Sequence, residues 1–282
     1  YLMGSVHVEK AIREEGLASS KKVQNYYTDL SLDEDLYQAV LAYSKSNEAS
    51  ELTGHKKKFL DDAMLSYKRS GFLLPAEDRK EVKTVLDRLT ELGLEFDKNI
   101  RSSQDTLFLK ENELEGLSDN YEKERLQKDG TYAIDTSYPS YSPFMKLAES
   151  DDARRRLRFK YNNRASDVNI EVLDDIYRNR IKLVELLGYK SYAEYRTEDR
   201  MAKNPKNVWD FENDLKQKLR PKAVRDVSEM LKIKSLRNGI KAKVIHPWEA
   251  GYYENQVKLK KYSLDSEEVK KYFEFNNVTQ GL

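Results

Sequence analysis

The stretch from Leu183 to Leu219, LVELLGYKSYAEYRTEDRMAKNPKNVWDFENDLKQKL, decides how the middle of this chain is organised. It contains the end of one amphipathic helix, a glycine stop at Gly188 and two helix starts. Ser191 has Glu194 three residues later, which is a capping-box pattern, and Asn204 precedes a proline whose missing N–H would be unpaired in a first helical turn anyway. The stretch therefore predicts three helices with tight joints.

The third of these helices has one apolar face and one basic region. Its apolar series is Val208, Phe211, Leu215, Leu219, Ala223 and Val227. We expect the first part of this face, from Val208 to Leu219, to pack against the helix that ends at Gly188. After Pro221 a basic helix is expected to continue to about Lys234.

Earlier segments predict more helices. Ser31 and Glu34 are in capping-box register ahead of a helix to Tyr43, and further helices are expected at 56–67 and 76–102. Gly93 lies inside the last of these and costs about 1 kcal/mol relative to Ala. Two helices are expected within 149–187, the second with a broad apolar face. That face comprises Ile170, Leu173, Ile176, Ile181, Val184 and Leu187.

The hydrophobic period changes between these helices. The runs 106–109 and 131–137 are the strand-like segments, and they predict one small antiparallel hairpin. Tyr138, Pro139, Tyr141 and Pro143 are interpreted as a rigid, turn-rich connection with a structural role. In the tail, Asp265 to Glu268 forms a capping box, with Leu264 and Val269 placed as a hydrophobic staple.

Composition limits the function. The 282 residues include 50 basic and 49 acidic side chains, a balance that gives no general attraction to nucleic acid or to an anionic membrane. The chain has no cysteine, which excludes disulfides, thiolate catalysis and cysteine-ligated metals. No run approaches the roughly 20 apolar residues of a membrane span, and no signal peptide is recognised. We therefore expect a soluble protein.

Several short motifs occur in an order that carries a resemblance. They are LLGYKSYAEY, RMAKNPKNVWDF and KLRP around the opening stretch, GFLLP at 71–75, ELEGLSDNY at 113–121, YPSYSPFMK at 138–146 and HPWEAGYY at 246–253. Together they resemble the helical part of the thimet oligopeptidase and neurolysin family of zinc metallopeptidases. Ser118, Glu249 and Glu274 stand where that family usually has Pro, Asp and Pro.

The resemblance implies a mainly all-α, multi-helix bundle of about ten helices with one small antiparallel hairpin. It implies a helical segment at 1–104, a hairpin-containing connection at 105–145 and a channel-wall segment at 146–282. Family members hydrolyse short peptides with a zinc-activated water inside a narrow channel. The similarity runs from about Ser20 to Leu282 and corresponds to the middle of a full-length member, so we expect a fragment whose zinc-bearing region would follow.

Catalysis in that family needs His-Glu-x-x-His on a helix. The histidines here, His7, His55 and His246, are too far apart in the sequence for that spacing. We therefore expect no catalytic residue and no metal ligand in this stretch, no bound zinc and no activity of the chain alone, and its substrate-binding residues are unknown from the sequence. Zinc belongs to the full-length family member.

Other candidate sites are weighed against structural roles. His246 and Glu249 could share a proton or a metal, but Pro247 between them favours a helix start. Trp248, Tyr252, Tyr253 and Tyr262 are interpreted as core aromatics. The charged run from Arg154 to Lys160 is interpreted as a solvated face.

Two alternative functions stay open. One is a non-catalytic helical module that binds peptides or acts as a scaffold. The other is a nucleic-acid binder built on residues 220–243, where eight basic residues oppose Asp226 and Glu229; the balanced charge argues against it. The expected partners are short peptides and the missing catalytic half, with no membrane partner. The expected compartment is the cytoplasm, with mitochondria as the alternative.

Overall fold

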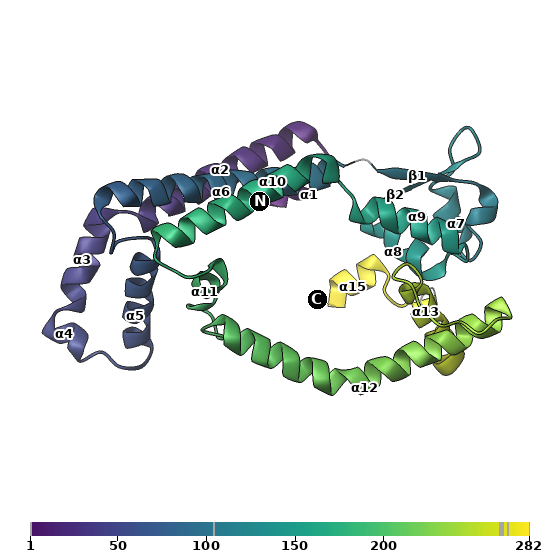
Figure 1. The fold of residues 1–282 in the computed structure, drawn as a ribbon. Helices are drawn as coiled ribbons and strands as arrows, with labels where there is room; N and C mark the ends of the chain where they lie inside the picture. The colour runs from purple at the N-terminus through teal and green to yellow at the C-terminus, as the bar shows by residue number, and fades with distance from the viewer. Residues whose placement is uncertain (1, 104, 265–267, 270, 282) are drawn as a thin grey trace. The chain divides into compact units, whose positions relative to one another are not determined.

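The computed structural model describes residues 2–103, 105–264, 268–269 and 271–281 (Figure 1). These residues are mainly α-helical and contain one two-stranded antiparallel sheet. The predicted fold class is therefore confirmed, although the described residues form fourteen α-helices rather than about ten. None of the described helices is long and apolar enough to cross a membrane.

The chain forms two compact units, and each is assembled from two separate segments. Unit 1 comprises Tyr1–Ser103 and Ala165–Asp214, and unit 2 comprises Gln104–Arg164 and Leu215–Leu282. The division into segments 1–104, 105–145 and 146–282 stays a prediction.

Unit 1 is built from helices. They are α1 (Leu2–Val6), α2 (Lys10–Ser31), α3 (Glu34–Ser44), α4 (Asn47–Ser50), α5 (Gly54–Arg69), α6 (Ala76–Ser102), α10 (Ser166–Leu186), α11 (Tyr192–Thr197) and the first part of α12 (Pro205–Asn238). The long helices α6 and α10 lie side by side (Figure 1). Their bounds agree with the predicted helices over 76–102 and the second half of 149–187.

Two small apolar clusters hold α6 against α10. Toward one end Val82 and Val85 of α6 pack on Leu183, and toward the other Leu92 packs on Val172 and Ile176. The broad apolar face predicted for α10 is only partly correct, because its outer members point to solvent. Ile170 and Ile181 are exposed, since α6 covers a narrower face than the apolar pattern suggests.

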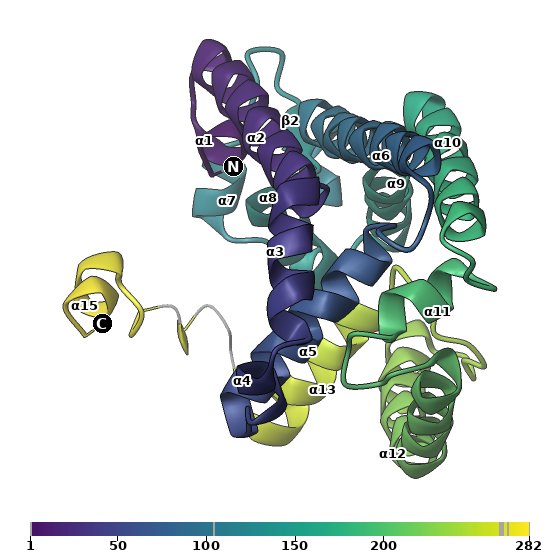
Figure 2. The same ribbon diagram turned by 90° about the vertical axis from the view of Figure 1, so that its left-hand side faces the viewer.

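The start of α3 differs from the prediction. Asp33, not Ser31, caps this helix, and its carboxylate accepts the Leu36 N–H at 2.8 Å. Ser31 is the last residue of α2, and its hydroxyl donates back to the Thr28 carbonyl. Figure 2 shows α3 and α5 side by side, joined through α4. The predicted Ser31 cap is wrong because an acidic residue nearer the helix supplies the acceptor.

Both helix starts in the opening stretch are confirmed. The Ser191 hydroxyl accepts the Glu194 N–H at 3.1 Å, and the Asn204 side-chain oxygen accepts the Asn207 N–H at 2.9 Å. The helix that follows Asn204 is α12, which continues through Pro221 without a break.

The predicted packing of α12 is wrong. No residue of this helix is buried, and Phe211 is 64% exposed. The face from Val208 to Leu219 therefore does not pack on the helix that ends near Gly188. Regular apolar spacing identified a face, but it did not identify a neighbour for that face.

Unit 2 contains the sheet and the shorter helices. They are β1 (Thr106–Leu109), the 3-10 helix η1 (Glu111–Glu113), α7 (Asp119–Lys123), β2 (Tyr132–Asp135), α8 (Tyr138–Leu147), α9 (Asp151–Asn162), the rest of α12, α13 (Ala250–Tyr262) and α15 (Phe275–Gly281). β1 and β2 pair antiparallel with Leu107 opposite Ile134, which confirms the predicted hairpin.

The core of unit 2 lies between the sheet, α8 and α9. Leu109, Ile134, Phe144 and Leu157 are among its fully buried members. Gly116 closes the loop beside this core with a φ of +92°, and a Cβ there would stand 2.3 Å from the Leu147 carbonyl oxygen. Only glycine fits both the backbone angle and the space.

Of two further sequence interpretations, the structure corrects one and does not describe the residues of the other. The segment from Tyr138 to Pro143, interpreted as a turn-rich connection, is the start of α8, where Pro139 occupies the first turn. Proline is tolerated there because its nitrogen would be unpaired in any case. The capping box predicted at Asp265 to Glu268 lies outside the described residues.

Candidate functional site

The three histidines lie in unrelated surroundings. His7 accepts the Glu9 N–H, His55 is exposed in the first turn of α5, and His246 precedes α13. Among the described residues no group of three or more His, Asp or Glu side chains could hold a metal ion. The described side chains therefore do not offer a donor set that fits the zinc implied by the resemblance, and the lack of metal ligands outside the described residues stays a prediction.

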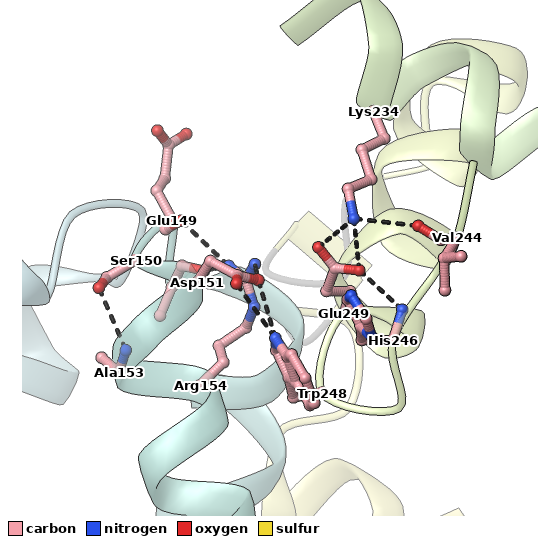
Figure 3. Close-up of polar contacts among 11 residues, drawn as sticks. Glu149, Ser150, Asp151, Ala153, Arg154, Lys234, Val244, His246, Trp248 and Glu249 are labelled. Carbon is pink, nitrogen blue, oxygen red and sulfur yellow. Dashed lines mark hydrogen bonds and ion pairs between the residues drawn. The ribbon is translucent and has the colours of Figure 1, made fainter. Parts of the chain in front are cut away.

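His246 and Glu249 are hydrogen-bonded, but the contact uses the backbone of His246 and the side chain of Glu249. One Glu249 oxygen accepts the His246 N–H at 2.7 Å, directly before α13 begins (Figure 3). The other oxygen lies 2.6 Å from Lys234 Nζ, and the exposed fractions of the two side chains are 13% for Lys234 and 4% for Glu249. Lys234 also donates to the Val244 carbonyl. Glu249 therefore fixes the loop between α12 and α13, which is a structural role.

The imidazole of His246 is occupied by stacking. Its ring lies parallel to the Trp248 ring with centroids 4.5 Å apart. The indole N–H of Trp248 donates to both carboxylate oxygens of Asp151, at 3.1 Å (Figure 3). These contacts join the loop before α13 to the first turn of α9.

Arg154 is the central buried cation of this region. It is 1% exposed and donates to the carbonyls of Ala148 and Glu149 and to Asp151 (Figure 3). Its guanidinium carbon lies 4.2 Å from the centre of the Tyr252 ring. The interpretation of 154–160 as a solvated face is therefore wrong at its first residue, because unpaired carbonyls before α9 require a donor.

The predicted aromatic core is confirmed in part. Tyr252 and Tyr253 are buried, Trp248 is half-buried against the core, and Tyr262 is exposed. Burial raises the pKa of Tyr252, and the nearby Arg237 opposes that shift. These rings form a wall of unit 2 rather than an open stacking surface.

The basic residues of 220–243 are partly neutralised. Lys222 pairs with Asp226 at 2.5 Å, Lys234 pairs with Glu249, and Arg237 pairs with Glu149 at 3.0 Å. Two of these contacts reach outside α12 and have a structural purpose. The cluster of Figure 3 thus holds α9, the end of α12 and α13 together, and it presents no nucleophile beside a base.

Unit 1 contains an open groove that the sequence interpretation missed. Its volume is about 610 Å³, and it runs along α6 and α10 to α11, with one contribution from α2. Its apolar floor includes Leu86, Leu89, Phe96 and Ile176. Pockets of roughly 300–1,000 Å³ with an apolar floor and a few polar groups are typical ligand sites.

The α11 end of the groove is firmly positioned. Arg69 of α5 is buried, donates to the Tyr195 carbonyl and pairs with Glu198 at 3.4 Å. Although partial burial opposes it, the Tyr189 hydroxyl and Lys68 hold the pKa of Glu198 below its ordinary value. The carboxylate therefore stays ionised, and α11 stays attached to the end of α5.

The signal that could have found the groove is Gly93. This glycine lies in the middle of a strongly amphipathic helix, where it is unfavourable by about 1 kcal/mol relative to Ala. A Cβ at Gly93 would meet nothing within 4 Å, because the groove opens beside it. A costly small residue on a periodic helix can mark an open surface.

Comparisons with known proteins agree with the resemblance carried by the motifs. Residues 144–282 match the model of peptidase family M3. Thimet-like oligopeptidase of Dictyostelium discoideum is 24% identical over 99% of this chain and 44% of its own length. Oligopeptidase A of Salmonella typhimurium is 27% identical over 99% and 43%, and saccharolysin of Saccharomyces cerevisiae is 28% identical over 98% and 41%.

These matches all point to one family of peptidases. The chain belongs to the thimet oligopeptidase family, peptidase family M3, as the order of its motifs indicated. It spans less than half the length of these curated relatives.

Proposed function

We propose that this chain is part of a zinc-dependent oligopeptidase that hydrolyses short peptides, and that its helices form a wall of the substrate channel and limit substrate size. The observation that carries the proposal is the alignment of 98–99% of the chain with named oligopeptidases. Because the alignments cover 41–44% of those relatives, hydrolysis is assigned to residues outside this chain.

The surface of α12 supports this proposal. The helix has 34 residues and buries none of them, although it exposes large apolar side chains. They include Trp209, Phe211, Leu219, Val224 and Leu236. Exposed apolar patches of this kind are typical of surfaces that contact another part of a protein or a ligand.

Zinc enters the proposal only through the residues outside this chain. When bound there, it would supply an activated water for peptide hydrolysis. The residues of this chain contribute shape and binding surface. The compartment is proposed to be cytoplasmic or mitochondrial, and a mitochondrial intermediate peptidase of Yarrowia lipolytica is among the relatives.

A chimera tests the proposal. The segment of Salmonella oligopeptidase A that aligns with this chain is replaced by residues 1–282, and the purified chimera is given quenched fluorogenic peptides of increasing length. We expect chelator-sensitive turnover of short peptides and a loss of turnover with long ones. The parental enzyme is the positive control for turnover and its length dependence.

Two outcomes would contradict the proposal. One is a chimera that folds, as judged by circular dichroism and gel filtration, but cleaves no peptide. The other is chelator-sensitive turnover by residues 1–282 alone after contaminating protease has been excluded, because hydrolysis is assigned to residues outside them.

The groove of unit 1 keeps a second candidate open, a non-catalytic peptide-binding module. The groove of unit 1 lies wholly within this chain and has the volume of a ligand site. Peptide binding by the isolated chain is therefore compatible with both functions, whereas turnover by the chimera separates them.

A further inference from the structure

The groove of unit 1 changes character along its length. From Leu86 to Asp97 it follows α6, where the lining is apolar at Leu86, Leu89, Leu94 and Phe96 and polar at Thr90 and Asp97. Its other end is formed by Arg180 of α10 and by Tyr192 and Arg196 of α11. The groove therefore combines a long apolar floor with two cations at one end.

The two arginines have no carboxylate to neutralise them. Within the described part of the chain, neither Arg180 nor Arg196 forms an ion pair, in contrast to Arg69 and Arg88 of the same unit. Arg180 stacks on the Tyr192 ring with its guanidinium carbon 4.8 Å from the ring centre. Arg196 is exposed and lies one helical turn after Tyr192 on the same helix.

This arrangement leaves guanidinium N–H groups available beside an apolar surface. Arginine presents a planar fork of donors that matches a carboxylate, and stacking on an aromatic ring restrains its orientation. A negatively charged ligand group is therefore favoured at this end of the groove. The rest of the ligand must be apolar enough to cover the floor.

The length of the groove sets the size of the ligand. The stretch from Leu86 to Asp97 corresponds to roughly 16 Å of helix at about 1.5 Å per residue. An extended peptide advances about 3.3 Å per residue, so roughly four to five residues fill the groove. This matches a short peptide and leaves no room for a folded chain.

We infer that this groove binds the carboxyl-terminal part of a short peptide, with its terminal carboxylate between Arg180 and Arg196 and its apolar side chains on the floor formed by α6 and α10. The choice of a peptide over another apolar carboxylate rests on the proposed function. The site lies on this chain alone and contains none of the residues that would carry out hydrolysis.

Binding is measured by fluorescence anisotropy with purified residues 1–282. The probes are the tetrapeptide Leu-Ala-Phe-Leu, labelled with fluorescein through an amino-terminal linker, as the free acid and as the carboxyl-terminal amide. We expect the acid to bind at least tenfold more tightly than the amide, because the amide removes the charge and keeps the apolar contacts. Equal affinities, or no binding of either probe, would overturn the inference.

Substitutions locate the site. Arg196→Gln, at an exposed position, should weaken binding of the acid about fivefold or more and leave the amide unchanged, and Arg180→Gln should do the same. Gly93→Leu should weaken both probes because its side chain fills the groove. Thr84→Leu, at an exposed position of α6 that does not line the groove, is the matched control and should leave both unchanged. Wild-type affinity in Arg196→Gln and Gly93→Leu, with folding confirmed by circular dichroism, would place the binding elsewhere and refute the site.

A competitor separates peptides from acyl chains. Decanoate carries a carboxylate on an apolar chain but has no peptide groups, and it should displace the acid probe at least tenfold less well than the unlabelled tetrapeptide. If decanoate displaced the acid probe at the same concentration as the unlabelled tetrapeptide, the groove would be assigned to acyl chains and the inference would be overturned. If the chimera cleaves peptides while this chain binds the acid and the amide equally well, the proposed function stands and the carboxylate site fails. If the chimera folds but is inactive while this chain still prefers the acid, the carboxylate site stands and the proposed function fails.

Discussion

Lys234 and Glu249 form an ion pair of 2.6 Å in which the Glu249 side chain is 4% exposed. Removing one charge from a buried pair leaves the other without a partner, which typically costs 3–5 kcal/mol, whereas apolar replacement of both is often tolerated. The pair joins the end of α12 to the start of α13, so its loss should be felt in both helices.

The first prediction uses this relationship. Glu249→Leu and Lys234→Met should each lower the free energy of unfolding by about 3 to 5 kcal/mol, and the double variant should lose less than the sum of the two. Urea denaturation followed by circular dichroism measures the effect. Lys261→Met is the matched control, because Lys261 pairs with Glu229 at an exposed site and should cost less than about 1 kcal/mol. Additive losses would show that the two side chains do not act as a pair.

A second prediction compares the cap of α12 with its apolar face. Asn204→Ala should cost about 1 kcal/mol because it removes the acceptor for the Asn207 N–H. Phe211→Ala should change the stability of the isolated chain by less than about 0.5 kcal/mol, because the ring is 64% exposed. This order is the reverse of the one expected for a buried Phe211. Urea melts in which Phe211→Ala is the more damaging change would contradict the exposed position of α12.

A third prediction concerns Arg154. Arg154→Met should destabilise the chain by about 3 kcal/mol or more, because two carbonyls lose a buried donor. In a Trp209→Phe background Trp248 becomes the only indole. Its fluorescence emission should shift to longer wavelength, because Asp151, which accepts the Trp248 indole N–H, loses Arg154 as a partner. Arg155→Met is the control: its side chain is 56% exposed, and neither signal should change appreciably. An unchanged emission in Arg154→Met would mean that Arg154 does not position Asp151.

A fourth prediction separates backbone strain from steric overlap at two glycines. Gly116 and Gly130 have φ values of +92° and +81°. Gly130→Ala meets nothing within 4 Å and should cost roughly 1 kcal/mol from the left-handed backbone alone. Gly116→Ala should cost clearly more, because its Cβ would overlap the Leu147 carbonyl oxygen. Thermal melts of the two variants measure the difference, and equal midpoints would show that the loop at Gly116 can move away from α8.

The elements that sequence could predict are those that local rules specify. The helix of 76–102 and the hairpin have periods of 3.6 and 2 residues, and the Ser191 and Asn204 caps depend on neighbours within three residues. The Ser31 cap failed because Asp33 competes for the same role two residues later. Local chemistry was sufficient only where one candidate was present.

The side chains that sequence could not place depend on distant partners. Phe211 belongs to a regular apolar face, but nothing in its own helix says whether another element covers that face. Arg154 begins a charged run, yet the carbonyls before α9 draw it into the core. The groove of unit 1 is formed by α2, α6, α10 and α11, so no single segment contains it.

The interleaving of the two units has a consequence for synthesis of the chain. Leu92 packs on Val172 and Ile176, about 80 residues further along, and residues 104–164 of the intervening segment belong to unit 2. At roughly 5–20 residues per second, α6 waits about 4 to 16 seconds for α10 to be made. During that time its apolar stripe, including Val82 and Val85, has no native partner on α10. Unit 1 therefore cannot finish folding before the first segment of unit 2 has been synthesised.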